Sequence, residues 1–181
     1  MSDASLETRH LTLVPSAAEH LLALIEGPEQ FERLAGLRVV PELRGFLTSD
    51  DVSPAWLAAL HQAHGVDPWR HGFFVQHRAS GAVIGSAGFK GPPDSTGMVE
   101  IAYGVVPAFE GRGYATEAAA ALVRFASASG AVRLIRAHTR PEPNASTRVL
   151  EKCGFHRIAE IVDPEDGPVW RWERSPASLS S

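Results

Sequence analysis

The hydrophobic pattern of the first 65 residues predicts one strand followed by helices. Apolar and polar residues alternate over 11–13, as they do in a half-buried strand. An apolar segment over 18–25, ended by glycine and proline, predicts a helix. Ser53 followed by Pro54 marks the start of another helix that runs to about residue 64. Glycine and proline interrupt the helical spacing of residues 29–47, so no element is predicted there.

From residue 73 onward the pattern changes to short β-branched and aromatic segments separated by turn-forming residues. Helices are predicted over 116–129 and 144–153, the second capped by Asn144 and ended by Gly154. The order strand, helix, strand over 98–139 is a crossover that places both strands in one sheet. The predicted fold class is therefore α+β, with a central mixed, mostly antiparallel sheet of six to seven strands and helices on both faces. The strands predicted in this half are 73–77, 82–90, 98–105, 132–139, 158–162 and 169–173.

Length and composition narrow the class of protein. A chain of 181 residues fits one domain with its own core. Its 17 Lys and Arg against 21 Asp and Glu give a net charge of -4, which argues against a protein that binds nucleic acid. No segment approaches ~18 consecutive apolar residues, and the polar N-terminus has no signal-peptide core, so we expect a cytoplasmic protein without a membrane span. The lone Cys153 excludes an intramolecular disulfide and a multi-cysteine zinc site, and we expect no metal.

The segment 105–118 carries the candidate chemistry. Gly111 and Gly113 let the backbone approach a ligand closely, and they directly precede a predicted helix. The first N–H groups of a helix have no internal partner and carry partial positive charge, so this loop is suited to a phosphate or pyrophosphate. Arg112 adds a cation. The Lys-Ser/Thr of a Walker loop and the third glycine of a dinucleotide fingerprint are both absent.

With its flanks, this loop resembles the acyl-CoA-binding signature of the GCN5-related N-acetyltransferases (GNAT). Residues 110–115 read Glu-Gly-Arg-Gly-Tyr-Ala against the family's Gln/Arg-x-x-Gly-x-Gly/Ala. Residues 144–155 resemble the family's Asn-x-x-Ser…Glu-Lys-x-Gly-Phe element, and 100–105 and 8–13 resemble strands of the RimJ/RimL-like subgroup. The resemblance implies a GNAT domain over 1–175, with a sheet splayed at its middle, followed by a disordered tail over 176–181.

The resemblance also implies the substrates and their site. The substrates would be acetyl-CoA and an amine, with a backbone N–H near Val105 polarising the thioester carbonyl as an oxyanion donor. Loop N–H groups would hold the pyrophosphate, while Asn144 and Ser146 would face the pantetheine arm and the sulfur. The cofactor-binding residues implied are Val105, Gly111, Arg112, Gly113, Tyr114, Ala115, Thr116, Asn144 and Ser146.

Two residues are candidates for catalysis. Glu100 matches an acid of the RimL-like subgroup and is the candidate general base; its alternative is a solvated strand residue. The tyrosine that many family members place in the last helix corresponds to Leu150 here, so Ser146 is the candidate proton donor to the CoA thiolate, with helix capping as its alternative. Glu110 departs from the family's Gln or Arg, and we expect it to point to solvent. Cys153 is expected to pack rather than react, which implies direct transfer without an acyl-cysteine.

Several functional alternatives remain open. The acceptor amine could belong to a protein N-terminus, an amino-acid-like metabolite or another small molecule. An α-amine has a pKa of about 8 and costs only ~1 kcal/mol to deprotonate at neutral pH, against roughly 4–5 kcal/mol for lysine. The chain could instead be a catalytically weak CoA-binding or sensing module, or a transferase for a longer acyl-CoA. We expect a monomer or a homodimer.

Overall fold

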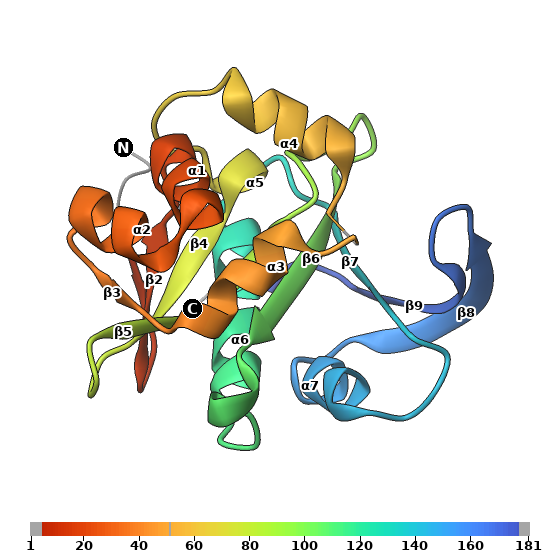
Figure 1. Ribbon diagram of the computed structural model, residues 1–181. Coiled ribbons are helices and arrows are strands. Elements are labelled where there is room, and N and C mark those ends of the chain that lie inside the picture. The colour runs from red at the N-terminus through yellow and green to blue at the C-terminus, as the bar shows by residue number, and fades with distance from the viewer. Residues whose placement is uncertain (1–4, 51, 178–181) are drawn as a thin grey trace.

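The computed structural model of the chain describes residues 5–50 and 52–177. Within these residues, nine strands form one mixed sheet in the order β1-β2-β4-β5-β6-β7-β9-β8, with β3 paired to β5 (Figure 1). Only the β3/β5 and β6/β7 pairs are parallel. The strands are β1 Leu6–Glu7, β2 Leu11–Pro15, β3 Arg38–Val39, β4 Phe73–His77, β5 Ala82–Phe89, β6 Met98–Val105, β7 Leu134–Thr139, β8 His156–Asp163 and β9 Gly167–Arg174.

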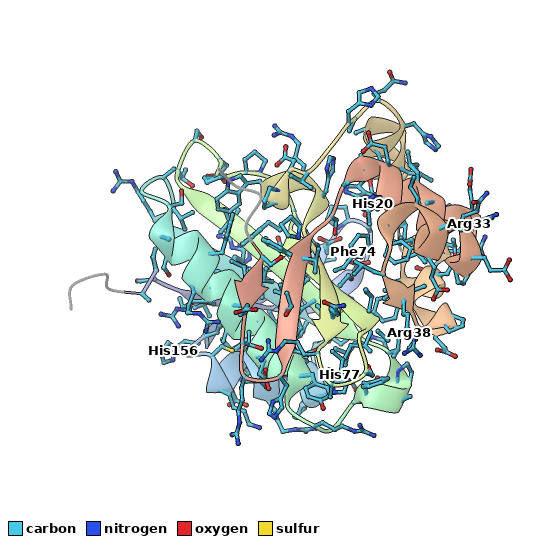
Figure 2. The ribbon with its side chains drawn as sticks, turned by 90° about the vertical axis from the view of Figure 1, so that its left-hand side faces the viewer. His20, Arg33, Arg38, Phe74, His77 and His156 are labelled. Carbon is cyan, nitrogen blue, oxygen red and sulfur yellow. The ribbon has the colours of Figure 1, made fainter. Side chains whose placement is uncertain are left out.

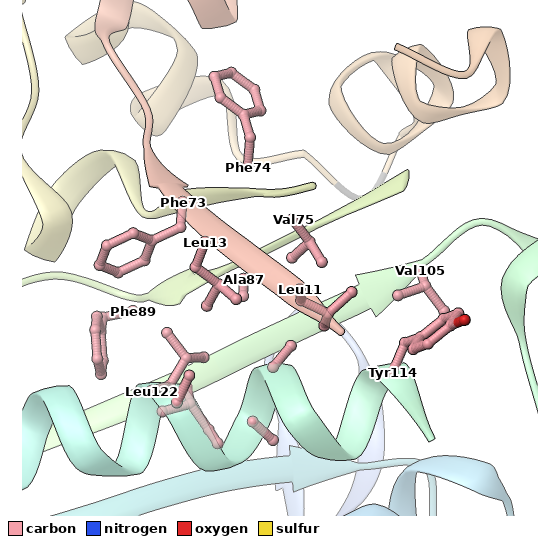
Figure 3. Close-up of a cluster of buried hydrophobic side chains, with 14 of the residues drawn as sticks. Leu11, Leu13, Phe73, Phe74, Val75, Ala87, Phe89, Val105, Tyr114 and Leu122 are labelled. Atoms are coloured by element: carbon pink, nitrogen blue, oxygen red, sulfur yellow. The ribbon is translucent and has the colours of Figure 1, made fainter. Parts of the chain in front are cut away.

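Helices cover both faces of this sheet, as the fold class predicts. The adjacent β4 residues Phe73 and Phe74 point to opposite faces (Figure 3). The Phe73 ring contacts Phe125 of one helix at 5.5 Å between centroids, and the Phe74 ring contacts Phe31 of another at 5.0 Å. The helices are α1 Ala18–Glu26, α2 Pro28–Ala35, α3 Gly45–Thr48, α4 Pro54–His61, α5 Pro68–His71, α6 Tyr114–Ala128 and α7 Ala145–Lys152, with 3₁₀ turns at Pro41–Arg44 and Pro107–Phe109.

The sheet opens at its middle, between β6 and β7. These two strands pair only over 98–100 and 134–136. Beyond that point β6 continues for five residues paired to β5 alone, while β7 continues paired to β9. The splay that the family resemblance implies is therefore present, and α7 with the β8–β9 hairpin lies on the far side of the opening from the N-terminal helices (Figure 1).

The sequence pattern located the long strands and missed the shortest elements. The seven strands of five or more residues match the six to seven predicted, and β1 and β3, of two residues each, add the other two. Helix α6 begins two residues before the predicted residue 116, because the αL conformation of Gly113 starts it there. Helix α4 begins at its predicted cap, where Ser53 accepts the Trp56 N–H, and ends at His61 instead of about residue 64.

Segment 29–47, for which no element was predicted, holds α2, β3 and α3. Helix α2 ends at Gly36, whose φ of 72° is the left-handed conformation that glycine adopts at low cost. Pro41 begins the 3₁₀ turn Pro41–Arg44 and Gly45 begins α3, so the glycines and prolines that obscure the helical spacing mark the boundaries of short elements.

The described part of the predicted tail, residues 176–177, makes a hydrogen bond to a helix. The backbone N–H of Ala177 donates to the Ser127 hydroxyl at 2.7 Å, so 176–177 lie against α6, and 178–181 fall outside the described residues. Across the described part of the chain, no helix is long and apolar enough to cross a membrane. The same residues contain no group of three or more His, Cys, Asp or Glu side chains placed to hold a metal ion.

Candidate active site

A cavity of about 600 Å³ lies beside the opening in the sheet. This volume is in the range of small-molecule sites. Its walls come from the end of β6, the glycine loop, the first turn of α6 and one face of α7. The lining residues are Tyr103, Gly104, Val105, Phe109, Glu110, Gly111, Gly113, Tyr114, Ala115, Thr116, Ala145, Ser146, Arg148, Val149 and Lys152.

The glycine loop presents an anion-binding surface to this cavity. Gly111 and Gly113 have φ values of 76° and 84°, and a Cβ added to either would meet no protein atom within 4 Å. The space beside the backbone is therefore free for a ligand. Gly113 is also the N-cap of the 15-residue α6, whose first N–H groups, at Tyr114, Ala115 and Thr116, lie where the helix has no internal acceptors for them. The N-terminal partial charge of the helix thus faces the cavity.

The backbone N–H of Val105 points into the opening between β6 and β7. In the β5/β6 ladder, Lys90 N–H donates to the Glu100 carbonyl at 2.9 Å and Val106 N–H donates to the Ile84 carbonyl at 2.8 Å. Even-numbered β6 residues therefore bond to β5, and odd-numbered ones, such as Val105, direct their N–H groups to the other side. On that side β7 has already separated, so the Val105 N–H is available to a ligand.

The cations that line the cavity come from α7. Arg148 and Lys152 are lining residues, one turn apart on the helix. Arg112, the cation expected from the sequence, is not among the lining residues; its guanidinium lies over the Phe109 ring, 5.4 Å from the centroid. Glu110 is exposed, as expected, and is also among the residues that line the cavity.

The two α7 candidates have different positions. Asn144 is the N-cap: its side-chain oxygen accepts the Thr147 N–H at 2.9 Å, and the Thr147 hydroxyl accepts the Asn144 N–H at 2.9 Å. Asn144 does not line the cavity, whereas the exposed Ser146 does. Tyr103 also lines the cavity: its hydroxyl donates to the Ser146 carbonyl at 3.4 Å, and burial raises the pKa of Tyr103, so the phenol stays protonated.

Glu100 lies at the point where the β6/β7 pairing ends and does not line the cavity. Its side chain is 15% exposed, and its Oε2 forms an ion pair with Lys90 Nζ at 3.1 Å and a hydrogen bond with the His138 ring at 2.8 Å. Val105 is five positions after Glu100 on the same strand, which corresponds to about 16 Å between Cα atoms. The expected general base is thus a partly buried, paired carboxylate at the apex of the opening.

Two sets of contacts that the sequence did not predict fix the first turn of α6, next to the glycine loop. The hydroxyl of Tyr114, the first residue of α6, forms a hydrogen bond with His77 Nε2 at 3.1 Å. The centroids of the two rings lie 5.1 Å apart. Figure 2 shows His77 at the end of β4. Glu117, in the first turn of α6, binds Thr8 and His10. Glu117 lies within the segment 105–118 that carries the candidate chemistry, although no contact was predicted for it.

Cys153 packs at the C-terminal end of α7. It is 8% exposed, and burial raises the pKa of its thiol. A protonated, buried thiol is a poor nucleophile. Leu150, at the position of the family's tyrosine, is fully buried in the core.

Comparison with known sequences identifies relatives of this chain. A sequence model of the acetyltransferase (GNAT) domain matches residues 10–156. The uncharacterized N-acetyltransferase YjdG of Bacillus subtilis (strain 168) is 32% identical over 99 residues, which cover 53% of this chain and 56% of YjdG. The match therefore spans about half the length of that curated relative.

Solved structures share the fold over nearly the whole chain. An acetyltransferase of the GNAT family from Bacillus anthracis has a TM-score of 0.63 at 17% identity and covers 96% of this chain and 99% of its own. RimL, a ribosomal L7/L12 alpha-N-protein acetyltransferase solved in complex with coenzyme A, has a TM-score of 0.65 at 16% identity and covers 95% of this chain and 98% of its own. At these identities the likeness concerns the fold.

Proposed function

The chain belongs to the acetyltransferase (GNAT) domain family, and from this premise we propose that it moves the acetyl group of acetyl-CoA directly to the nitrogen of a primary amine. The observation that carries the proposal is the convergence of two kinds of backbone N–H on one cavity. The loop and the start of α6 offer N–H groups suited to a pyrophosphate, and the Val105 N–H faces the opening in the sheet.

The residues of the cavity fit acetyl-CoA. The pyrophosphate would lie against Gly111, Gly113 and the first turn of α6, where a side chain on either glycine would obstruct it. Arg148 and Lys152 would add positive charge beside the phosphates. The pantetheine arm would then run past Ser146 toward Val105. RimL, whose fold this chain shares, was solved with coenzyme A, which supports the same use of the cavity here.

The transfer would take place in the opening between β6 and β7. The neutral amine attacks the thioester carbonyl, and the Val105 N–H donates to the oxygen of the tetrahedral intermediate. The C–S bond then breaks, the acetyl group stays on nitrogen, and the CoA thiolate takes a proton, for which the hydroxyl of Ser146, a residue of the cavity wall, is the candidate donor. Glu100 accepts the proton lost by the amine, and its separation from Val105 requires that this proton pass through water. Because Cys153 is buried and protonated, the transfer has no acyl-cysteine stage.

The acceptor would enter from the face that carries α3. Even-numbered β6 residues direct their side chains to this face, since a Cβ on Gly104 would meet the Phe46 ring of α3 at 3.1 Å. Glu100 therefore lies on the acceptor side, opposite α6. We propose an α-amine as the acceptor, of a protein N-terminus or a small molecule, because its lower pKa suits a base that acts through water.

Thiol release from acetyl-CoA in the presence of an amine panel tests this proposal. The panel contains peptides with free N-termini, amino acids and polyamines, with an N-terminally acetylated, lysine-free peptide as the blocked control. Release with at least one α-amine, with the acetylated product identified by mass spectrometry, supports the proposal. Tight binding of acetyl-CoA without release across the panel would favour the sensing module, and faster release from propionyl- or succinyl-CoA would favour the longer acyl donor.

Thermal stabilisation tests the substrate site independently of turnover. Ligand at 100 times its Kd stabilises a protein by about 2.7 kcal/mol, which for a chain of this size raises Tm by roughly 5–10 °C. No shift at millimolar acetyl-CoA would contradict the assignment of the cavity.

A further inference from the structure

We infer that Arg171 and His138 form a fixed hydrogen-bonded chain to Glu100, in which His138 is held neutral with its proton on Nδ1 and orients the carboxylate. This inference deepens the proposed function, because it rests on Glu100 as the base. It assigns His138 and Arg171 as positioning residues, and neither takes part in proton transfer.

The chain crosses three neighbouring strands. His138 Nδ1 of β7 lies 2.8 Å from Glu100 Oε2 of β6, and the Nε of Arg171 on β9 lies 3.1 Å from His138 Nε2. His138 and Arg171 are direct partners in the β7/β9 register. The side chains of Glu100 and His138 are only 15% and 17% exposed, so water competes weakly for these bonds.

The chemistry of arginine decides the protonation of the ring. The guanidinium is always charged, and its N–H groups only donate. His138 Nε2 must therefore be the acceptor, so it carries no proton while this bond is made. A neutral imidazole has its one proton on the other nitrogen, so Nδ1–H donates to Glu100 Oε2. A second consequence is that His138 cannot pass a proton through Nε2 without first breaking the bond to Arg171.

The contacts of Glu100 with Lys90 and His138 involve only one of its two carboxylate oxygens. Lys90 Nζ and His138 Nδ1 both bind Oε2, and no described residue donates to Oε1. Oε1 is also not among the described buried atoms that lack a partner, so it has solvent-accessible surface. Oε1 is thus the oxygen that can take a proton from the amine through water, while Oε2 fixes the rotation of the carboxylate.

The other charged groups around His138 are already paired. Arg136, next to Glu100 in the β6/β7 register, binds Glu173 of β9 at 2.6 Å and so does not compete for Glu100. Asp163, at the end of β8, is a further anion near Lys90 and His138. Hydrogen bonds from the backbone N–H groups of Asp166 and Glu165 hold the pKa of Asp163 below its usual range, so it stays an anion near neutral pH.

Histidine ¹⁵N chemical shifts measure the tautomer without any turnover. Protonated and unprotonated ring nitrogens give well-separated shifts, and the His138 signals are assigned by their loss in His138→Asn. In the wild type near neutral pH we expect the Nε2 shift of an unprotonated nitrogen and the Nδ1 shift of a protonated one. In Arg171→Met, which removes the donor to Nε2, we expect Nε2 to gain protonated character. An Nε2–H tautomer or an imidazolium in the wild type would overturn the inference.

Two substitutions of His138 separate positioning from packing. His138→Asn places an amide N–H near the position of Nδ1–H, whereas His138→Ala removes the donor. We expect His138→Ala to lower kcat about tenfold with an unchanged KM for acetyl-CoA, since a small misplacement of a catalytic group has a large effect on rate, and His138→Asn to recover most of the loss. The exposed His61 of α4 gives the control variant His61→Ala, which should match the wild type. Equal losses in His138→Ala and His138→Asn would overturn the positioning role. A wild type inactive toward every amine would contradict the proposed function, and the ¹⁵N measurement would still decide the tautomer.

Discussion

The carboxylate of Glu117 lies 2.6 Å from the Nδ1 of His10, although 107 positions separate the two residues in the sequence. The same carboxylate accepts the Thr8 hydroxyl at 2.5 Å and the His10 backbone N–H at 3.0 Å. Because Glu117 belongs to the first turn of α6, these bonds fasten the β1–β2 turn to the helix start that borders the anion-binding loop. The contact therefore joins the edge of the sheet to the proposed pyrophosphate site.

Glu117→Gln should lower the free energy of unfolding by about 1–2 kcal/mol at pH 7, because hydrogen bonds to a charged group are lost or weakened. Urea denaturation measures this. Glu29→Gln is the matched control, since Glu29 also lies in the first turn of a helix. Its side chain is exposed and makes no hydrogen bond to another described residue. Equal losses in both variants would mean that the helix dipole, and not the contact with His10, accounts for the effect.

The contribution of Glu117 should also depend on pH. Partial burial alone would raise the pKa of Glu117, but the hydrogen bonds from Thr8 and His10 outweigh it and hold the pKa below the ordinary 4.5. A pKa lower in the folded than in the unfolded protein gives stability that is present above pH 4.5 and is lost as the pH falls through the folded value. The difference in unfolding free energy between wild type and Glu117→Gln should therefore shrink as the pH falls below 4.5. A difference that grows below pH 4.5 would contradict this sign.

Gly113→Ala should weaken acetyl-CoA binding at least tenfold. The φ of 84° strains any L side chain by about 1 kcal/mol, and the added methyl would project toward the cavity that Gly113 lines. Gly36→Ala is the control: Gly36 has a φ of 72°, equally open surroundings and a position outside the cavity. Both variants should lose similar stability in urea, and only Gly113→Ala should lose affinity by calorimetry. Unchanged binding in Gly113→Ala would remove the loop from the proposed site.

Glu100→Gln should lower kcat on the order of a hundredfold, the lower range of general-base effects, while the Kd of acetyl-CoA stays the same. The amide keeps the shape of the carboxylate and an oxygen that can accept from His138 and Lys90, so the strand contacts survive. Steady-state kinetics at saturating acceptor and calorimetry give the two quantities. Full turnover in this variant would leave Glu100 as an ion-pair partner on the sheet.

The long strands and the glycine loop could be predicted because their signals are local. A strand of five or more residues shows its alternation or its apolar character within itself, and the helix start after Gly113 is marked by residues next to it. β1 and β3 have two residues each and show no period, so only their pairing with β2 and β5 defines them.

The partners of the candidate residues could not be predicted, since they come from other strands. Glu100 was identified, but its contacts with Lys90 and His138 follow from the β5/β6 and β6/β7 registers, which no single segment encodes. The cavity cations likewise depend on which face α7 turns inward, and this packing brings Arg148 and Lys152 to the cavity and leaves Arg112 over Phe109.

Substitutions of the α7 capping box distinguish two roles for Asn144. Asn144→Ala removes the cap and should cost about 1 kcal/mol of stability. Thr147→Val removes the hydroxyl that accepts the Asn144 N–H and donates to the Asn144 carbonyl, and it is the matched variant. If Asn144 acts only as a cap, both variants are less stable in urea and bind acetyl-CoA like the wild type. A loss of affinity confined to Asn144→Ala would instead support the contact with pantetheine that the family resemblance implies.

Lysine labelling can locate the phosphates, because Lys90 and Lys152 are the two lysines of the chain. Lys152 is exposed and lines the cavity, whereas Lys90 binds Glu100 on the acceptor side and lies outside the cavity. Coenzyme A should therefore protect Lys152 from an amine-reactive ester several-fold more than it protects Lys90, as peptide mass spectrometry would measure. Lys90 serves as the internal control in the same sample. If coenzyme A raises Tm but leaves the labelling of Lys152 unchanged, the phosphates lie away from α7, and the positive charge beside them must come from the helix start of α6 alone.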